Sequence, residues 1–197
     1  GNEGGEKEFT FTTESFPSKP IVIKAHNGSV SDVVFAEQGN SLYSSSSDST
    51  IMKSSWSAIT PSSVVIRKAG SRIMKIRLSE DESKLMIAEE RGKVVLLDHL
   101  NSASLSQKEL ISTSELLKSL EFSKDGKLLA CGTSDGNIFL FEESNNYLNP
   151  KKIKAHQSPI YAISFKDDNR LLATGAGNGE IKLWQTSNFL FEPLLLK

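Results

Sequence analysis

Short stretches of alternating apolar and polar residues recur along the chain at a nearly constant spacing. The first stretch of each unit begins at positions separated by 43, 44 and 43 residues, namely Val30, Ile73, Leu117 and Ile160. Its last inward-facing position keeps the same steps, at Phe35, Leu78, Phe122 and Phe165. A second stretch opens with these steps at Thr50, Lys93, Asn137 and Glu180. The tetrapeptide Ile-Lys-Ala-His also occurs twice, at 23–26 and 153–156. Landmarks that share one period predict four copies of one structural unit.

Each unit is predicted to be a set of short strands joined by tight turns. The stretches 30–35 and 160–165 are rich in β-branched and aromatic residues and are bounded by turn formers. Turns are predicted at 124–127 and 167–170, because Asp, Asn and Gly adopt turn conformations that bulkier residues resist. Four antiparallel strands in about 43 residues are the content of one propeller blade, so the sequence predicts an all-β fold.

The polar residues of the last unit resemble the pattern of the WD-repeat family. Repeats of that family carry a His before the innermost strand, a Ser or Thr on the second strand, an Asp in the next turn and a Trp on the third strand. The last unit has His156, Thr174 and Trp184 at these places, and Asn178 stands where Asp is usual. A buried polar group without a partner costs roughly 1–3 kcal/mol, so the resemblance implies that these side chains bond one another.

The first unit matches the same pattern in three of its four places. His26, Ser44 and Asp48 stand where the family has its His, hydroxyl and carboxylate, and Ser54 occupies the Trp position. The resemblance therefore implies a second polar set of the same kind in this unit.

The two middle units depart further from the family pattern. The third unit keeps Asp135, has Cys131 for the hydroxyl and Phe141 for the Trp, and lacks the His. The second unit keeps almost none of the set, with Gly70 near the His position and Leu97 near the Trp position. Its place in the fold is predicted by the spacing alone.

The resemblance implies an incomplete WD-repeat β-propeller, a fragment of a seven-bladed ring with four four-stranded antiparallel blades and the outer strands of a fifth. We expect a tail and outer half-blade at 1–24, and then blades at 25–69, 70–113 (degenerate), 114–155 and 156–197. Outer-half strands are expected at Lys7–Thr12 and Pro20–Lys24, and the last outer strand near Pro193–Lys197. A seven-bladed ring of this period needs about 300 residues. We therefore expect a piece of a longer protein or a ring that a second chain completes.

The composition argues against several classes of protein. The formal net charge of −1 provides no basic surface, so we expect neither nucleic-acid nor membrane binding. No apolar run reaches the roughly 18 residues of a membrane span, and the polar start from Gly1 to Glu8 is unlike a signal peptide. The single cysteine, Cys131, allows no internal disulfide framework. These features together predict an intracellular protein, cytoplasmic or nuclear.

The sequence contains no constellation that is typical of catalysis or metal binding. His26 and His156 occupy the same place in the repeat, and no Cys, Asp or Glu lies near either at the spacing of zinc ligands. Cys131 falls on a predicted buried strand. The glycine-rich stretch 175–179 precedes a strand instead of opening a helix, so it does not fit a dinucleotide-binding loop. We expect no enzymatic activity, no cofactor and no metal.

The resemblance implies a scaffold that binds a peptide or a protein domain across one rim of the propeller. Loops before the innermost strands and turns after the second strands share that rim, where they place Lys24, Asn27, Arg72, Glu90, Arg91, Ser114 and Gln157. Two arginines, Arg72 and Arg91, suit an acidic or phosphorylated peptide, although Glu89 and Glu90 offset their field.

Two other functions are alternatives. The order of well-formed and degenerate units also resembles the second propeller of the actin-interacting protein 1 family, which implies actin regulation together with cofilin. A hydrolase built on a propeller would instead need convergent carboxylates or a Ser/His pair, and the sequence offers neither.

Overall fold

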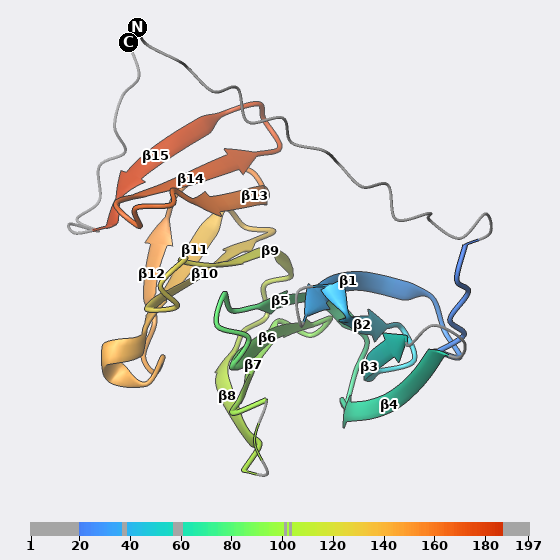
Figure 1. Ribbon diagram of the computed structural model, residues 1–197. Coiled ribbons are helices and arrows are strands. Elements are labelled where there is room, and N and C mark those ends of the chain that lie inside the picture. The colour runs from blue at the N-terminus through green and yellow to red at the C-terminus, as the bar shows by residue number, and fades with distance from the viewer. Residues whose placement is uncertain (1–19, 37–38, 57–60, 101, 103, 187–197) are drawn as a thin grey trace, which may run out of the picture.

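The computed structural model describes residues 20–36, 39–56, 61–100, 102 and 104–186, which form four antiparallel sheets (Figure 1). Blade 1 contains β1 (Val30–Ala36), β2 (Ser41–Ser46), β3 (Thr50–Trp56) and β4 (Pro61–Lys68). Blade 2 contains β5 (Ile73–Leu78), β6 (Lys84–Glu89), β7 (Lys93–Asp98) and β8 (Ser106–Ser112). Blade 3 contains β9 (Leu117–Phe122), β10 (Leu128–Thr133), β11 (Asn137–Glu142) and β12 (Lys151–Lys154). Blade 4 contains β13 (Ile160–Phe165), β14 (Leu171–Ala176) and β15 (Ile181–Gln185).

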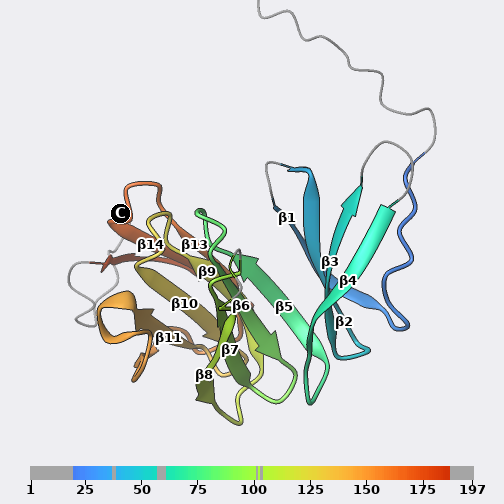
Figure 2. The ribbon, with the colours of Figure 1, turned by 60° about the horizontal axis from the view of Figure 1, so that its bottom comes forward.

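The predicted fold class, an incomplete propeller of antiparallel blades, is confirmed. The four innermost strands begin at the four residues that the repeat predicted. Each sheet runs in chain order from its innermost strand outward, and the sheets lie side by side in chain order (Figure 2). The described residues include a 3₁₀ turn, η2 (Glu143–Asn145), and none of the helices among them is long and apolar enough to cross a membrane.

One predicted strand is wrong. Residues Pro20–Lys24 are described, but they form no strand and pair with none of the described sheets. A strand exists through its hydrogen bonds to a neighbour, and the neighbour expected for this segment, Lys7–Thr12, lies outside the described residues. The outer strand expected near Pro193–Lys197 also lies outside them.

The hydrophobic core lies between successive blades. Each blade has a rear face, turned to the preceding blade, and a forward face, turned to the following one. Between blades 2 and 3, Val94 and Leu96 on the forward face meet Leu129 and Phe141 on the rear face. Fully burying one such side chain contributes roughly 1.5–3 kcal/mol. Similar clusters fill the gaps between blades 1 and 2 and between blades 3 and 4.

Hydrogen bonds between innermost strands add to this packing. The Ser31 hydroxyl donates to the Ile73 carbonyl at 2.6 Å, and the Ser119 hydroxyl donates to the Ile160 carbonyl at 2.9 Å. These bonds join blade 1 to blade 2 and blade 3 to blade 4, so neighbouring blades are held at their inner edges.

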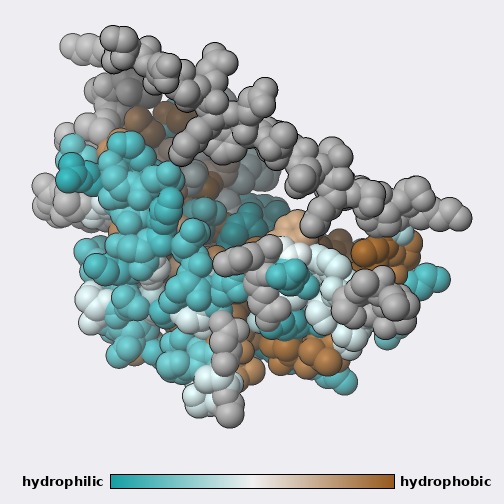
Figure 3. Space-filling model, viewed as in Figure 1, coloured by the Kyte–Doolittle hydropathy of each residue, from teal (hydrophilic) through white to brown (hydrophobic). Residues whose placement is uncertain are grey.

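The rear face of blade 1 is open to solvent. Phe35, expected to face inward, is 67% exposed, whereas Phe122 at the equivalent position of blade 3 is 7% exposed. The reason is that no described blade precedes blade 1, and the Phe35 ring lies edge-on to Trp56 of the same sheet. The space-filling view shows apolar side chains at the lower right, in the region where blade 1 lies (Figure 3).

Candidate functional site

A continuous set of backbone hydrogen bonds joins the loops at one end of the blades. In every blade the turn after the second strand donates an N–H to the loop before the innermost strand, in the pairs Ser47–Ser29, Glu90–Arg72, Ser134–Leu116 and Gly177–Pro159, at 2.8–2.9 Å. The carbonyl of the same turn then accepts an N–H from the loop that leads into the next blade, in the pairs Ser49–Ala69, Gly92–Thr113 and Gly136–Ala155, at 2.7–3.1 Å. We call this set of bonds the collar. It fixes the loops that carry the predicted rim.

Glycine residues at two turns of the collar allow the neighbouring loops to approach closely. Gly92 and Gly136 have φ angles of 72° and 77°, in the left-handed region that favours glycine. A Cβ on Gly92 would lie 2.1 Å from the Thr113 carbonyl oxygen, and one on Gly136 would lie 2.2 Å from the His156 carbonyl oxygen. A side chain at Gly92 or Gly136 would displace the loop that it contacts, whereas blade 1 has Ser49 at the equivalent place with a φ of 68°.

In blade 1 a histidine ties the loop to the sheet beneath the collar. His26 contacts the Ser44 hydroxyl through Nε2 at 2.7 Å and the Thr50 hydroxyl through Nδ1 at 2.8 Å. Thr50 donates its hydroxyl to Asp48 at 2.6 Å, so its oxygen accepts the Nδ1–H, and Nε2 accepts from Ser44. Asp48 also accepts the Asn27 N–H at 2.8 Å. Every polar atom of this set has a partner when the imidazole is neutral.

Hydrogen bonds keep the carboxylate of blade 1 ionised. Burial by itself would raise the pKa of Asp48, but the hydrogen bonds from Thr50 and Asn27 outweigh burial and hold the pKa below its ordinary value. A permanently charged acceptor strengthens the bonds that fix this loop.

In blade 4 the second histidine makes an equivalent tie. His156 is buried and contacts the Thr174 hydroxyl through Nε2 at 2.8 Å, and Thr174 also accepts the Trp184 indole N–H at 2.9 Å. The carboxylate that meets Nδ1, at 3.1 Å, belongs to Glu180. Asn178, which stands at the family's Asp position, instead accepts the Glu180 N–H through its side chain at 3.3 Å.

In blade 3 a glutamate takes the place of the histidine. Glu115, in the loop before β9, is buried and accepts hydrogen bonds from the Thr133 hydroxyl at 2.6 Å and the Asn137 amide at 2.9 Å. The Lys152 ammonium contacts its other oxygen. Burial would raise the pKa of Glu115, but these three donors hold it below its ordinary value. The loop of blade 3 is therefore tied to its sheet by a chemically different set.

In blade 2 a buried ion pair links the loop before β5 to the sheet. Arg67 on β4 donates to Glu89 at 2.6 Å and to the Gln107 side chain at 2.9 Å. Ser71, in the loop before β5, donates to the other Glu89 oxygen at 3.2 Å. Both charged side chains are more than nine-tenths buried. Glu89 therefore lies beneath the collar and not at the surface, where it was expected to offset the rim arginines.

The structure brings together only some of the residues that were predicted to form hydrogen-bonded sets. His26, Ser44 and Asp48 form one set, and His156, Thr174 and Trp184 form another. Asp135 is exposed and accepts from the Ser134 hydroxyl, while Phe141 is fully buried in the core between blades 2 and 3.

Sequence reasoning missed several members of the polar sets, namely Thr50, Arg67, Glu89, Glu115, Thr133, Asn137 and Glu180. One signal could have identified three of them, because Thr50, Asn137 and Glu180 are the landmark residues that open the third strand of their units. A polar residue at that repeated position lies within reach of the loop in each of these blades.

The predicted rim residues belong to the loops and turns that the collar joins. Six are exposed, namely Lys24, Asn27, Arg72, Arg91, Ser114 and Gln157, and Glu90 is half-buried. The Arg72 guanidinium lies 3.6 Å from the Glu90 carboxylate, so part of the charge of Arg72 is already balanced. Arg91 has no ion pair of this kind among the described residues.

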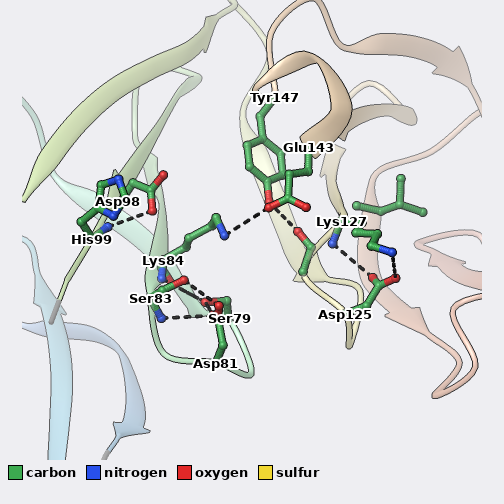
Figure 4. Close-up of polar contacts among 12 residues, drawn as sticks. Ser79, Asp81, Ser83, Lys84, Asp98, His99, Asp125, Lys127, Glu143 and Tyr147 are labelled. Atoms are coloured by element: carbon green, nitrogen blue, oxygen red, sulfur yellow. Dashed lines mark hydrogen bonds and ion pairs between the residues drawn. The ribbon is translucent and has the colours of Figure 1, made fainter.

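The opposite end of blades 2 and 3 is also polar, but its contacts mainly close individual turns (Figure 4). Ser79 donates to Asp81 at 2.6 Å within one turn. Lys84 lies 3.4 Å from Glu143, which links the two blades, and the Tyr147 hydroxyl donates to the Gly126 carbonyl. Burial and the surrounding acidic side chains raise the pKa of Tyr147. No group of three or more His, Cys, Asp or Glu side chains within the described ranges is placed to hold a metal ion.

Comparison with known families agrees with the repeat seen in the structure. The family model of the WD domain, G-beta repeat, matches residues 18–52, 106–142 and 149–185. These three segments cover more than half of the chain and leave out most of blade 2, the unit that keeps almost none of the polar pattern. No curated protein sequence matches the chain significantly.

Proposed function

Because the chain belongs to the WD-repeat family, whose members generally act as protein-interaction scaffolds, we propose that it binds a peptide or a protein domain across the collar end of its blades. The binding is non-catalytic. The observation that carries this proposal is the collar itself, which runs through all four described blades whether or not a blade keeps the family's histidine. Loops that are fixed before a ligand arrives lose less conformational entropy on binding.

The charges at the collar end favour an acidic or phosphorylated ligand. Lys24, Arg72 and Arg91 are exposed there, and the acidic residues at this end include Glu90 of the rim set and the exposed Asp135 in the turn of blade 3. Glu89 is buried against Arg67 and does not compete at the surface. Guanidinium groups bind carboxylates and phosphates through paired hydrogen bonds, so Arg91 is the residue expected to anchor such a ligand.

A peptide-display selection on the full chain, followed by fluorescence anisotropy with the enriched peptide, tests this function. We expect enriched peptides to be acidic, and the Arg91→Glu variant to weaken their binding roughly tenfold or more, which corresponds to about 1.4 kcal/mol. The matched control is Arg170→Glu, which reverses an exposed arginine in the turn between β13 and β14 at the opposite end. Equal weakening by both variants, or enrichment of peptides indifferent to both, would contradict the proposal.

The actin-regulatory alternative rests only on the order of well-formed and degenerate units. It predicts co-sedimentation of the chain with actin filaments that increases when cofilin is added. A scaffold of the proposed kind without this role leaves the sedimented fraction unchanged by cofilin.

The place of action in the cell is also part of the proposal. We propose a cytoplasmic or nuclear scaffold whose ligands are proteins, with neither nucleic acid nor membrane among them, because the formal net charge is −1. Fluorescence microscopy of the tagged chain tests the location, and secretion would contradict it.

A further inference from the structure

The interface between blades 3 and 4 shows which two kinds of surface fit together. Blade 3 presents Ala130, Ile138 and Leu140 on its forward face. Blade 4 receives them on a rear face that includes Ile163 and Trp184. All five side chains are buried there.

The forward face of blade 4 carries the same pattern one period later but is open. Ala173, Ile181 and Leu183 stand 43 residues after Ala130, Ile138 and Leu140. Ile181 is 71% exposed, whereas the equivalent Ile138 is fully buried. This face therefore has the chemistry that elsewhere contacts the rear face of a following blade.

The rear face of blade 1 is the matching open surface. Val33 and Leu42 stand where blade 4 has Ile163 and Leu172, and Val33 is 56% exposed. Ser54 replaces the tryptophan of blade 4, and this smaller side chain helps to line a groove of about 390 Å³ beside them. Each chain thus exposes one face of each kind.

The strand edge next to the forward face is open in the same way. In blade 3, β12 covers the edge of β11, with Ile153 opposite Ile138 and Lys154 opposite Asn137. In blade 4, β15 has no second neighbour among the described residues.

The collar ends at Gly179, which has the same place as Gly92 and Gly136. Those two glycines lie tightly against the loop that enters the next blade, whereas nothing lies within 4 Å of the Cβ position of Gly179. Its φ angle of 86° shows that the turn already has the conformation of the other two. The turn is shaped for a neighbouring loop.

We propose that two copies of this chain associate head to tail, with the rear face of blade 1 of each copy covering the forward face of blade 4 of the other. Two such contacts satisfy both open faces of both copies, and the assembly closes. A second copy supplies both matching faces.

Sedimentation velocity on the full chain at several concentrations tests this proposal. We expect a species of twice the chain mass of 21.6 kDa. The Val33→Asp and Ile181→Asp variants place a carboxylate in both contacts, and each should weaken dimerisation at least about 100-fold. The matched control is Val64→Asp, because Val64 is 57% exposed but lies on the other side of the blade 1 sheet, in register with Lys53. Circular dichroism checks that all three variants fold.

Mixing the two variants distinguishes head-to-tail contact from other dimers. A Val33→Asp copy keeps an intact blade 4 face and an Ile181→Asp copy keeps an intact blade 1 face, so their mixture should recover a heterodimer through one contact. A wild-type monomer at all concentrations would overturn the proposal. A wild-type species larger than two copies, a dimer that resists either substitution, or a mixture that stays monomeric would overturn it as well.

Discussion

Blades 3 and 4 solve the same structural problem with different chemistry. In blade 4 a neutral histidine links the loop to a threonine and a tryptophan, with a half-exposed glutamate at its other nitrogen. In blade 3 a buried glutamate gathers three donors in place of that histidine. In both blades the turn after the second strand makes the same collar bond to the loop before the innermost strand. The comparison teaches that the position of the loop is retained while the residues that hold it are exchanged.

Removing the acceptor of blade 3 should have the largest effect on this comparison. Glu115→Ala leaves the Thr133 hydroxyl proton and the Asn137 side-chain amide, both buried, without their acceptor, and we expect a loss of about 3 kcal/mol in the free energy of unfolding. His156→Ala in blade 4 leaves Thr174 still bonded to Trp184, so about 2 kcal/mol is expected. Urea denaturation measures both. A smaller loss for Glu115→Ala than for His156→Ala would contradict the assignment of Glu115 as the centre of its set.

Placing a hydroxyl group at position 131 of blade 3, where blade 4 has Thr174, should destabilise the chain. Cys131 occupies the position of Thr174 but is fully buried among apolar side chains, 4.0 Å from the Met86 sulfur. Burial raises the pKa of its thiol, which is consistent with an apolar site. Cys131→Ser should therefore cost about 1–3 kcal/mol, although it restores the residue typical of the family.

Two controls separate polarity from size at this position. Cys131→Ala removes a similar volume without adding a hydroxyl, so it should cost less than Cys131→Ser. Thr174→Val, which leaves the Trp184 N–H without an acceptor, should cost about as much as Cys131→Ser. If Cys131→Ser were as stable as the wild type by urea denaturation, the two blades would not differ as described.

Acid should affect the two blades in different pH ranges. Burial lowers the pKa of His156, and Glu180 partly opposes this shift. As the pH falls, this histidine is therefore protonated in the unfolded chain before it is protonated in the folded chain. The contribution of His156 to stability is complete above its ordinary value of 6.5 and is lost as the pH falls through its folded pKa. Glu115 also has a lowered pKa, so its contribution is complete above 4.5 and is lost below it.

Urea denaturation between pH 7.5 and 5.5 therefore reports on blade 4. We expect the His156→Gln variant to reduce the loss of stability over this range, by up to about 1.4 kcal/mol per pH unit. The control is His99→Gln, because His99 lies in an exposed position. An unchanged slope in His156→Gln would show that this histidine does not titrate as described.

The exposed partners of the two sets should matter least. The side chains of Lys152 and Glu180 are 51% and 48% exposed, so solvent screens their charges. Lys152→Met and Glu180→Gln should each cost less than about 1 kcal/mol by thermal denaturation. A loss above 2 kcal/mol for either would mean that the exposed partner, and not the buried one, holds the loop.

The blades could be predicted from sequence because strand periodicity and turn residues are local. The starts of the innermost strands followed from the spacing alone, and the two histidine sets followed from the family pattern. Glu115 and Arg67 could not be found in this way, because each acts from a position where the pattern has no polar residue. Their role depends on donors and acceptors that only the packing of loops and strands brings within reach.

The exposure of Phe35 could not be predicted for a related reason. The repeat places it at an inward position of its strand, and burial depends on whether another blade covers that face. A property shared between two units cannot be assigned from the pattern of one.

Amide hydrogen exchange measured by NMR tests the central claim most directly, which is that one collar holds the loops of all four blades. The reporting amides are those of Ser47, Glu90, Ser134 and Gly177. We predict slow exchange at all four, with the amides of Glu90 and Ser134 in blades 2 and 3 protected like the amide of Gly177 in blade 4. Fast exchange at Glu90 and Ser134 beside slow exchange at Ser47 and Gly177 would contradict the claim, since only the blades with a histidine would then hold their loops.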